Sequence, residues 1–182
     1  DTVVFDKTGS LTQASPKLSD VVSLDAKKSQ KEILGLAACL EEHFPHPVSR
    51  AVVRAAEEAG ADHFKEEHDS EVRYIVAHGI CSSVDGEKVV IGSRHFIEED
   101  EGVDVTPGLK HVERLAAEGK SVLYMAKGGK LIGILGIVDP LRPEAKDVIT
   151  ALRARGVKRV VMLTGDDERT AKNVCAQLGI TE

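Results

Sequence analysis

Several residue types are scarce in this chain of 182 residues. Trp is absent, and aromatic residues make up only 3% of the sequence. A core built from this chain must therefore be aliphatic. The three cysteines, Cys39, Cys81 and Cys175, lie far apart and form no Cys-x-x-Cys pair. This spacing argues against a disulfide framework and against a zinc site, and it indicates a reducing compartment.

Long hydrophobic runs and basic clusters are also missing. The longest apolar run, residues 131–138, is short and contains glycine, whereas a membrane-spanning helix needs about 20 apolar residues. A net charge of −6 without a basic run argues against nucleic-acid binding. We interpret the acidic cluster at residues 98–101 as a solvated loop. The chain begins at Asp1 without a start methionine or targeting segment, so we expect a cytoplasmic piece of a longer protein.

The most informative feature that is present is a carboxylate at the end of an apolar run. Asp6 follows residues 2–5, Thr-Val-Val-Phe, and precedes the polar segment Lys-Thr-Gly-Ser-Leu-Thr at residues 7–12. A carboxylate at the carboxyl end of a buried parallel strand can attack phosphorus. The polar loop after it offers N–H and hydroxyl donors to phosphoryl oxygens. The pattern predicts that Asp6 forms an aspartyl phosphate.

The heptad at residues 6–12 resembles the phosphorylation motif of P-type cation-transporting ATPases, D-K-T-G-T-[LIV]-T, with Ser10 keeping the hydroxyl of the central threonine. The resemblance implies that Asp6 is the nucleophile, that Lys7 and Thr8 position the phosphoryl group, and that Mg²⁺ binds at Asp6 and Thr8. Phosphatases of the wider haloacid-dehalogenase group generally carry a second Asp at the position of Thr8. Threonine there favours an enzyme that keeps its phosphoenzyme.

The first strand is not followed by the helix of a β-α-β crossover, which predicts an insertion. A capping box at Ser29 and Glu32 and a helix start at Pro47 mark two helices. An Asp-Gly pair at residues 85–86 marks a hairpin. The predicted elements are a helix that opens at the capping box and ends near residue 41, helices at 48–59 and 107–118, the last with Thr106 as its cap, and strands at 72–76, 80–84, 88–91, 121–126 and 130–138. This pattern indicates an inserted α+β domain.

Beyond the two prolines of residues 139–143, a helix (144–155), a strand (159–163) and a helix (169–178) restore the parallel α/β pattern. The strand ends in Thr164-Gly165-Asp166, where these residues could share a crevice with Asp6. The Thr-Gly-Asp triplet also resembles the P-type family. The resemblance implies that the threonine holds the transferred phosphoryl group and that the aspartate organises the loop near Mg²⁺.

The segment before the second helix carries a third resemblance. His46-Pro47 matches a dipeptide of the heavy-metal-transporting subgroup, in which a histidine and a glutamate five residues earlier, here Glu41, help to bind ATP. A helix amino terminus also favours an anionic ligand. The residues alone leave two alternatives open: packing, or a metal site formed by His43 and His46 with a neighbouring glutamate.

Two glycine segments complete the predicted nucleotide site. Gly79 and Ile80 match the subgroup's Gly-x-Gly-[VI] loop, in which Ala77 replaces the first glycine. Gly92 and Ser93 match a Gly-Asn pair, with serine in place of asparagine. A side chain at residue 77 restricts close backbone approach to a ligand, and serine keeps only part of the hydrogen bonding of an amide.

The resemblance implies a fold class and a domain organisation. We expect a truncated α/β, haloacid-dehalogenase-like (Rossmann-like) phosphorylation domain at residues 1–17 and 139–182. An inserted α+β nucleotide-binding domain at 18–138 is built on an antiparallel sheet flanked by helices. Residues 139–143 and the turn near residues 15–16 would form the hinge. The family's further G-D-G-x-N-D segment and its upstream lysine do not occur before Glu182, so we expect no turnover by this fragment.

The function implied is the ATP-binding and phosphorylation part of a heavy-metal-transporting P-type ATPase, with ATP and Mg²⁺ as cofactors. Its partners would be the membrane-spanning and actuator parts of the same polypeptide and a metal ion bound outside this chain, with no nucleic acid. It would be the cytoplasmic portion of an integral membrane protein. One alternative is a soluble haloacid-dehalogenase-type phosphatase whose middle domain is a substrate cap. Another is a nucleotide-binding module without chemistry of its own.

Overall fold

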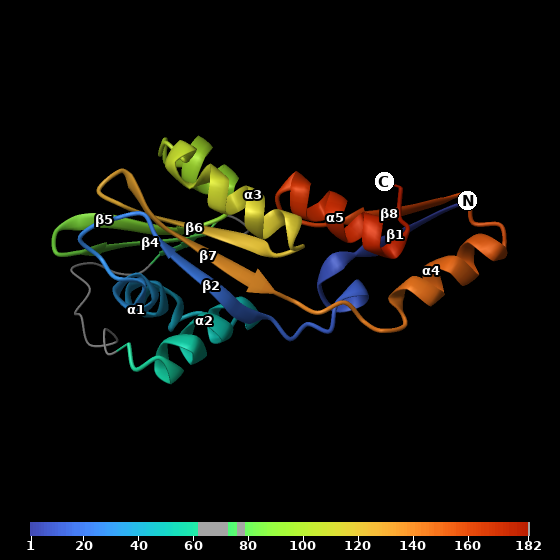
Figure 1. Cartoon of the computed structure of the whole chain (residues 1–182), viewed down its shortest axis with the longest axis horizontal. Coiled ribbons are helices and arrows are strands. Elements are labelled where there is room, and N and C mark those ends of the chain that lie inside the picture. The colour runs from blue at the N-terminus through green and yellow to red at the C-terminus, as the bar shows by residue number, and fades with distance from the viewer. Residues whose placement is uncertain (62–72, 76–78, 182) are drawn as a thin grey trace.

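The computed structural model describes residues 1–61, 73–75 and 79–181. Two lobes lie end to end, and both chain termini lie in the smaller one (Figure 1). The small lobe contains a two-stranded sheet, and the large lobe contains a six-stranded sheet. Ala77, which replaces the family glycine, lies outside the described residues. No helix in the described part of the chain is long and apolar enough to span a bilayer.

The small lobe places two strand ends side by side. Strand β1 (Thr2–Asp6) pairs in parallel with β8 (Arg159–Leu163), so that Asp6 lies opposite Leu163. Helices α4 (Ala145–Ala154) and α5 (Glu168–Leu178) contribute to an aliphatic core with Leu11, Val160 and Met162. Because parallel strands end at the same edge of a sheet, the loops that follow Asp6 and Leu163 meet there.

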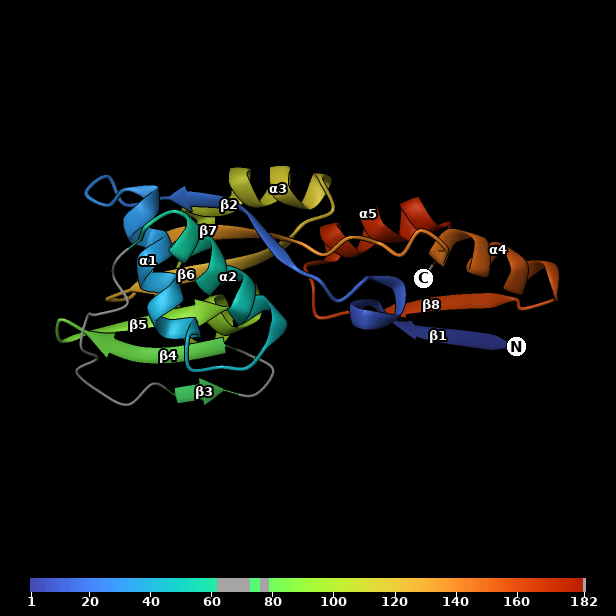
Figure 2. The same ribbon diagram turned by 90° about the horizontal axis from the view of Figure 1, so that it is seen from below.

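The large lobe is an antiparallel sheet with helices on both faces. Its strand order is β2-β7-β6-β5-β4-β3. The strands are β2 (Lys17–Ser23), β3 (Arg73–Ile75), β4 (Gly79–Val84), β5 (Glu87–Gly92), β6 (Ser121–Lys127) and β7 (Lys130–Val138). Helices α1 (Gln30–Glu41) and α2 (Pro47–Glu58) cover one face, and α3 (Leu109–Ala117) lies on the other (Figures 1 and 2).

The side chains of β5 pack into two hydrophobic cores, one on each face of the sheet. Val89 and Ile91 pack in the cluster with α1 and α2, whereas Val90 packs in the cluster with α3. This alternation follows from the two-residue period of a strand. A sheet buried on both faces needs apolar residues at successive positions, which is the pattern of residues 89–91. The predicted α+β fold with an antiparallel sheet is confirmed.

The predicted helices and strands are found with ends shifted by up to two residues. The capping box is present, since the Ser29 side chain accepts a hydrogen bond from Glu32 N–H and the Glu32 carboxylate accepts one from Ser29 N–H. The predicted cap at Thr106 is wrong. Residues Thr106–Gly108 form a 3-10 turn that leads into α3, and Thr106 N–H donates to Asp104 instead. The reason is that Pro107 opens this tighter turn before the α-helix starts.

The acidic cluster at residues 98–101 lies at the surface, as predicted, but the prediction of a loop is wrong. Residues Phe96–Asp100 form a helical turn whose first two side chains are buried. Within this segment Glu98 accepts from Arg94 at 2.7 Å, and Glu101 pairs with Lys88. Burial of Phe96 and Ile97 holds the acidic side chains at the surface in these pairs.

The two segments that connect the lobes run beside each other. Gln13 N–H donates to the carbonyl of Pro140 at 2.9 Å, and Arg142 N–H donates to the carbonyl of Leu11 at 2.8 Å. The Asp139 carboxylate accepts from the Thr12 hydroxyl at 2.5 Å and from a backbone N–H at 3.1 Å. These are the segments predicted to form the hinge, and their role as a hinge remains a prediction.

Candidate functional site

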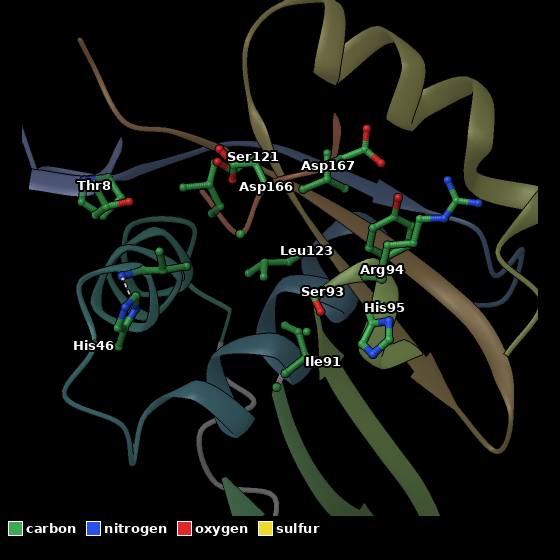
Figure 3. A pocket seen from close by; sticks show the side chains of 18 of the residues that line it. Thr8, His46, Ile91, Ser93, Arg94, His95, Ser121, Leu123, Asp166 and Asp167 are labelled. Carbon is green, nitrogen blue, oxygen red and sulfur yellow. Dashed lines mark hydrogen bonds between the residues drawn. The ribbon is translucent and has the colours of Figure 1, made fainter. Parts of the chain in front are cut away.

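A pocket of about 760 Å³ lies where the two lobes meet (Figure 3). This volume falls within the range of about 300–1,000 Å³ that is typical of small-molecule sites. All the predicted site residues except Thr164 line it, namely Asp6, Lys7, Thr8, Glu41, His46, Gly79, Ile80, Gly92, Ser93, Gly165 and Asp166. The fold therefore brings together motifs that are far apart in the sequence.

The small lobe contributes the end of β1 and the loop after it. Asp6 and Thr8 are exposed to the pocket, whereas Lys7 is buried. The Lys7 ammonium pairs with the Asp166 carboxylate, and these two side chains are only 7% and 12% exposed. The ammonium also donates to the hydroxyl of Ser121, which belongs to the large lobe, at 3.2 Å. Lys7 thus joins both strand ends of the small lobe to strand β6 of the large lobe.

Thr164 takes part in the turn that follows β8. Its hydroxyl accepts a hydrogen bond from Asp166 N–H at 3.1 Å. This bond turns the side chain toward its own loop, which explains why Thr164 is absent from the pocket lining. Gly165 is exposed in the same turn, and a side chain there would meet no atom within 4 Å. The Thr-Gly-Asp segment therefore presents an open backbone to the pocket.

Helix ends contribute Glu41 and His46. Glu41 is the last residue of α1 and is buried, and burial raises the pKa of its carboxyl above the ordinary value. His46 is the N-cap of α2, where its Nδ1 accepts from Val48 N–H at 3.2 Å. Because Nδ1 is an acceptor, the neutral ring carries its proton on Nε2, which can donate to a ligand. Figure 3 shows this cap at one side of the pocket.

Strands β4 and β5 contribute the glycines. Gly79 and Gly92 are cross-strand partners. A Cβ on Gly79 would lie 2.4 Å from the Ile91 carbonyl oxygen and 2.5 Å from Phe96 Cδ1, so that only glycine fits there. Ser93 accepts from the Phe96 N–H at 3.3 Å and so caps the next helical turn. Both glycines line the pocket, and the space beside Gly79 is filled by the Ile91 backbone and the Phe96 ring.

Several pocket residues were not predicted from the sequence. Arg94 and Asp167 lie on the side of the pocket opposite His46 (Figure 3). The Tyr124 hydroxyl is the one buried side-chain polar atom without a hydrogen-bond partner among the described residues, and burial raises its pKa to about 12. Ser49 and Ser121 also line the pocket. Ser49, Ser121 and Tyr124 have no sequence signal, because each is a single polar residue inside a helix or strand. Asp167 follows the Thr-Gly-Asp triplet directly and is the N-cap of α5.

A metal site requires several His, Cys, Asp or Glu side chains close together. Within residues 1–61, 73–75 and 79–181, no group of three or more His, Cys, Asp or Glu side chains is arranged to hold a metal ion. In the described part of the chain, His43 and His46 therefore do not belong to a cluster of ligands that could form the alternative metal site. Mg²⁺ differs, because it is bound through one or two carboxylates plus substrate phosphates and water. The exposed Asp6 carboxylate fits such an ion when it arrives with a nucleotide.

The large lobe, inserted between the two segments of the small lobe, faces Asp6 across one pocket, as expected for a haloacid-dehalogenase-like fold with an inserted domain. Comparison with known proteins agrees: residues 1–182 match the family model of haloacid dehalogenase-like hydrolases, and the chain belongs to that family. Within it, the predicted resemblance to heavy-metal P-type ATPases is confirmed. The chain is 35% identical over its whole length to a manganese-exporting P-type ATPase of Mycobacterium leprae (strain TN). It spans about a quarter of that relative, 25% of its length.

Solved structures agree with this family. The crystal structure of a zinc-transporting PIB-type ATPase in the E2.Pi state has a TM-score of 0.64 at 32% identity. The match covers 98% of this chain and 28% of that chain. The catalytic domain of the CPx-ATPase CopB-B has the same fold, with a TM-score of 0.64 at 23% identity over 100% of this chain and 61% of that one. The predicted haloacid-dehalogenase-like fold class is thus confirmed.

Proposed function

We propose that this chain is the ATP-binding and phosphorylation part of a heavy-metal-transporting P-type ATPase. The observation that carries the proposal is the single pocket shared by Asp6 and by the wall around Glu41, His46 and Gly79. A nucleophile and a nucleotide-sized cavity occupy one site. The comparisons support the class, because the similar proteins are P-type ATPases that carry heavy metals.

In this proposal the large lobe, residues 18–138, binds ATP. Glu41 and His46 recognise the base from one side, and the backbone at Gly79 and Gly92 provides a wall close to the ligand. Ile80 supports that wall from the core. The buried carboxyl and the helix-capping histidine support this assignment, because both are held in place before a ligand arrives.

The small lobe, residues 1–17 and 139–182, performs the transfer. The Asp6 carboxylate attacks the γ-phosphorus, the bond to the β,γ-bridging oxygen breaks, and ADP leaves with that electron pair. Lys7 and Thr8 position the phosphoryl group, and Asp166 holds the Lys7 ammonium in place. Thr164 would join them after its hydroxyl turns from Asp166 N–H into the pocket. Mg²⁺ held at Asp6 and Thr8 would neutralise phosphate charge. The aspartyl phosphate then drives a rearrangement of the lobes about residues 139–143.

The partners belong to the same proposal. Membrane-spanning and actuator parts of the polypeptide would convert the phosphorylation cycle into metal movement, and the metal would bind outside this chain. The named relatives support a heavy metal as a class, because one exports manganese and another transports zinc.

The test is Asp6→Asn in the intact transporter. We expect loss of acid-stable phosphoenzyme formed from ATP labelled on the γ-phosphate, with ATP binding retained, because an amide cannot act as the nucleophile. Asp147→Asn, an exposed change on α4 away from the pocket, is the matched control and should leave phosphorylation unchanged. Phosphoenzyme persisting in Asp6→Asn would refute the assignment.

The phosphatase alternative has weaker support. The family model describes hydrolases in general, and the large lobe could serve as a cap over a small substrate. However, the second position after the nucleophile is Thr8, whose hydroxyl cannot replace a carboxyl as general acid and base. Rapid hydrolysis of p-nitrophenyl phosphate by the intact protein, with no ATP-dependent phosphoenzyme, would favour the phosphatase.

A further inference from the structure

Glu41 and Ser49 form a buried hydrogen-bonded pair in the wall of the pocket. Their exposed fractions are only 6% and 3%, and both residues line the cavity. The Ser49 hydroxyl lies within hydrogen-bonding distance of Glu41 Oε2. Ser49 belongs to none of the motifs that predicted the site, and its place beside Glu41 depends on the packing of α1 against α2.

The backbone around this pair is well anchored. Glu41 ends α1, and its carbonyl accepts from Phe44 N–H at 3.1 Å. Ser49 lies in the first turn of α2, which His46 caps, and Arg50 donates to the carbonyl of Pro45 at 3.0 Å. The segment between the helices is therefore held at several points, and the two side chains meet in a defined geometry.

The hydrogen bond determines which carboxyl oxygen is left for a ligand. In the described part of the chain, Ser49 is the hydrogen-bond partner of the Glu41 carboxyl, through Oε2. When Glu41 is ionised, the serine hydroxyl donates to Oε2 and Oε1 is an acceptor. When Glu41 is neutral, its proton can lie on Oε1, and that oxygen is then a donor. The Ser49 hydroxyl, as a donor to Oε2, lowers the pKa of Glu41 and thus favours the ionised form, in which Oε1 is an acceptor.

This effect matters because burial favours the neutral carboxyl and raises the pKa of Glu41. Without the Ser49 hydroxyl the neutral form is favoured further, and a neutral carboxyl can present a donor to the pocket. Adenine carries an amino donor at C6, whereas guanine and hypoxanthine carry a carbonyl acceptor there. An acceptor at Oε1 therefore accepts a hydrogen bond from adenine and repels a 6-oxo purine.

We propose that Ser49 is a positioning residue that keeps Glu41 Oε1 a hydrogen-bond acceptor and thereby makes the pocket select adenine over 6-oxo purines. This inference rests on the proposed function, because it assigns the base-recognition end of that nucleotide site. It adds a determinant of specificity that acts through Glu41 and does not require contact between Ser49 and the nucleotide.

The experiment compares ATP with inosine triphosphate, which differs from it by the 6-oxo group. Dissociation constants are measured by calorimetry on the 182-residue chain as wild type, Ser49→Ala and Ser49→Thr. We expect the wild type to prefer ATP, Ser49→Ala to lower the preference about tenfold, and Ser49→Thr to restore it by returning a hydroxyl. Ser82→Ala removes a buried serine of the same lobe outside the pocket and should leave the preference unchanged.

The outcomes separate this inference from the function on which it rests. An unchanged ATP preference in a folded Ser49→Ala variant would overturn the role of Ser49 while ATP binding stands. Failure of the wild type to bind ATP at millimolar concentration would overturn both. If Ser49→Ala unfolds, Ser49→Cys replaces it, because a thiol fills the space but bonds weakly. An intermediate preference is then expected, and a wild-type preference would overturn the proposal.

Discussion

At the scale of single residues, Lys7 carries a buried charge that depends on one carboxylate. Its ammonium pairs with Asp166 and donates to Ser121, and both members of the ion pair are largely removed from water. Removing one partner of a buried pair leaves the other charge without compensation. Lys7 therefore serves the architecture of the site as well as its chemistry.

Asp166→Ala should lower the free energy of unfolding by about 3–5 kcal/mol, because the Lys7 ammonium loses its carboxylate in a buried setting. Urea unfolding at neutral pH measures the change. Asp147→Ala, an exposed acidic residue in the first turn of α4, is the matched control and should cost about 0.5 kcal/mol. Equal losses in the two variants would show that the pair contributes nothing beyond surface charge.

The buried carboxyl of Glu41 should make the stability of the protein depend on pH. Burial raises its pKa above the ordinary 4.5, and the bond to Ser49 offsets only part of this shift. The folded state therefore holds its proton to higher pH than the unfolded state. The stability from this group is fully present below about pH 4.5 and is lost as pH rises through the higher pKa of the folded state.

Glu41→Gln removes this titration, so the variant should gain stability relative to wild type as pH rises above about 4.5, by at most about 1.4 kcal/mol per pH unit. Urea unfolding at a series of pH values measures the difference. Glu58→Gln on the exposed end of α2 controls for an added amide. A difference that stays constant with pH would contradict the buried, proton-holding carboxyl.

At the scale of elements, the pairing of β4 with β5 depends on Gly79. A side chain there would strike the Ile91 carbonyl and the ring of Phe96. The glycine is therefore required for strand packing, whatever it contributes to a nucleotide. Gly165 is the contrasting case, since its surroundings are open.

Gly79→Ala should lower the free energy of unfolding by about 1–3 kcal/mol without any nucleotide, because the added Cβ forces the strands and Phe96 to shift. Gly165→Ala, which meets no atom within 4 Å, should change it by less than about 0.5 kcal/mol. Thermal unfolding of both variants measures these changes in stability. A fully stable Gly79→Ala with impaired ATP binding would assign this glycine to the ligand alone.

At the scale of the whole molecule, the lobes are joined by hydrogen bonds between α5 and the end of α3. The fully buried Thr170 hydroxyl donates to the carbonyl of Lys120 at 2.8 Å. Asn173 donates to the carbonyl of Ala117 at 2.8 Å, and Arg169 pairs with Glu113 at 2.9 Å. These contacts are polar, so the lobes can separate without exposing a large apolar surface.

Thr170→Val with Asn173→Ala should widen the distribution of distances between the lobes, because two carbonyls lose their donors. Spin labels at the exposed positions Glu57 on α2 and Arg153 on α4 report the distances by pulsed dipolar spectroscopy. Lys172→Ala, an exposed change on α5, is the control and should leave the distribution unchanged. An unchanged distribution in the double variant would show that the remaining contacts, including Lys7 with Ser121, Arg169 with Glu113 and the paired connecting segments, are sufficient to hold the lobes.

Much of the architecture followed from local chemistry. The capping box at Ser29 and the Asp-Gly turn after Val84 located a helix and a hairpin, because those signals act within a few residues. The prediction of a helix cap at Thr106 was wrong because the local sequence did not indicate the 3-10 turn before α3. The prediction of a loop at the acidic segment was wrong because the burial of Phe96 and Ile97 determines the conformation there.

The sequence by itself determined the family and the order of the elements, since both rest on contiguous motifs or on periodicity. It also predicted a set of site residues, of which all but Thr164 line one pocket. Only the tertiary structure decided how those residues meet. It showed that Lys7 reaches Ser121 across the lobes and that Ser49 holds Glu41. It also showed that Tyr124 places a buried hydroxyl beside the pocket. The physical reason is that these contacts depend on the angles between packed helices and lobes, which no short stretch of sequence encodes.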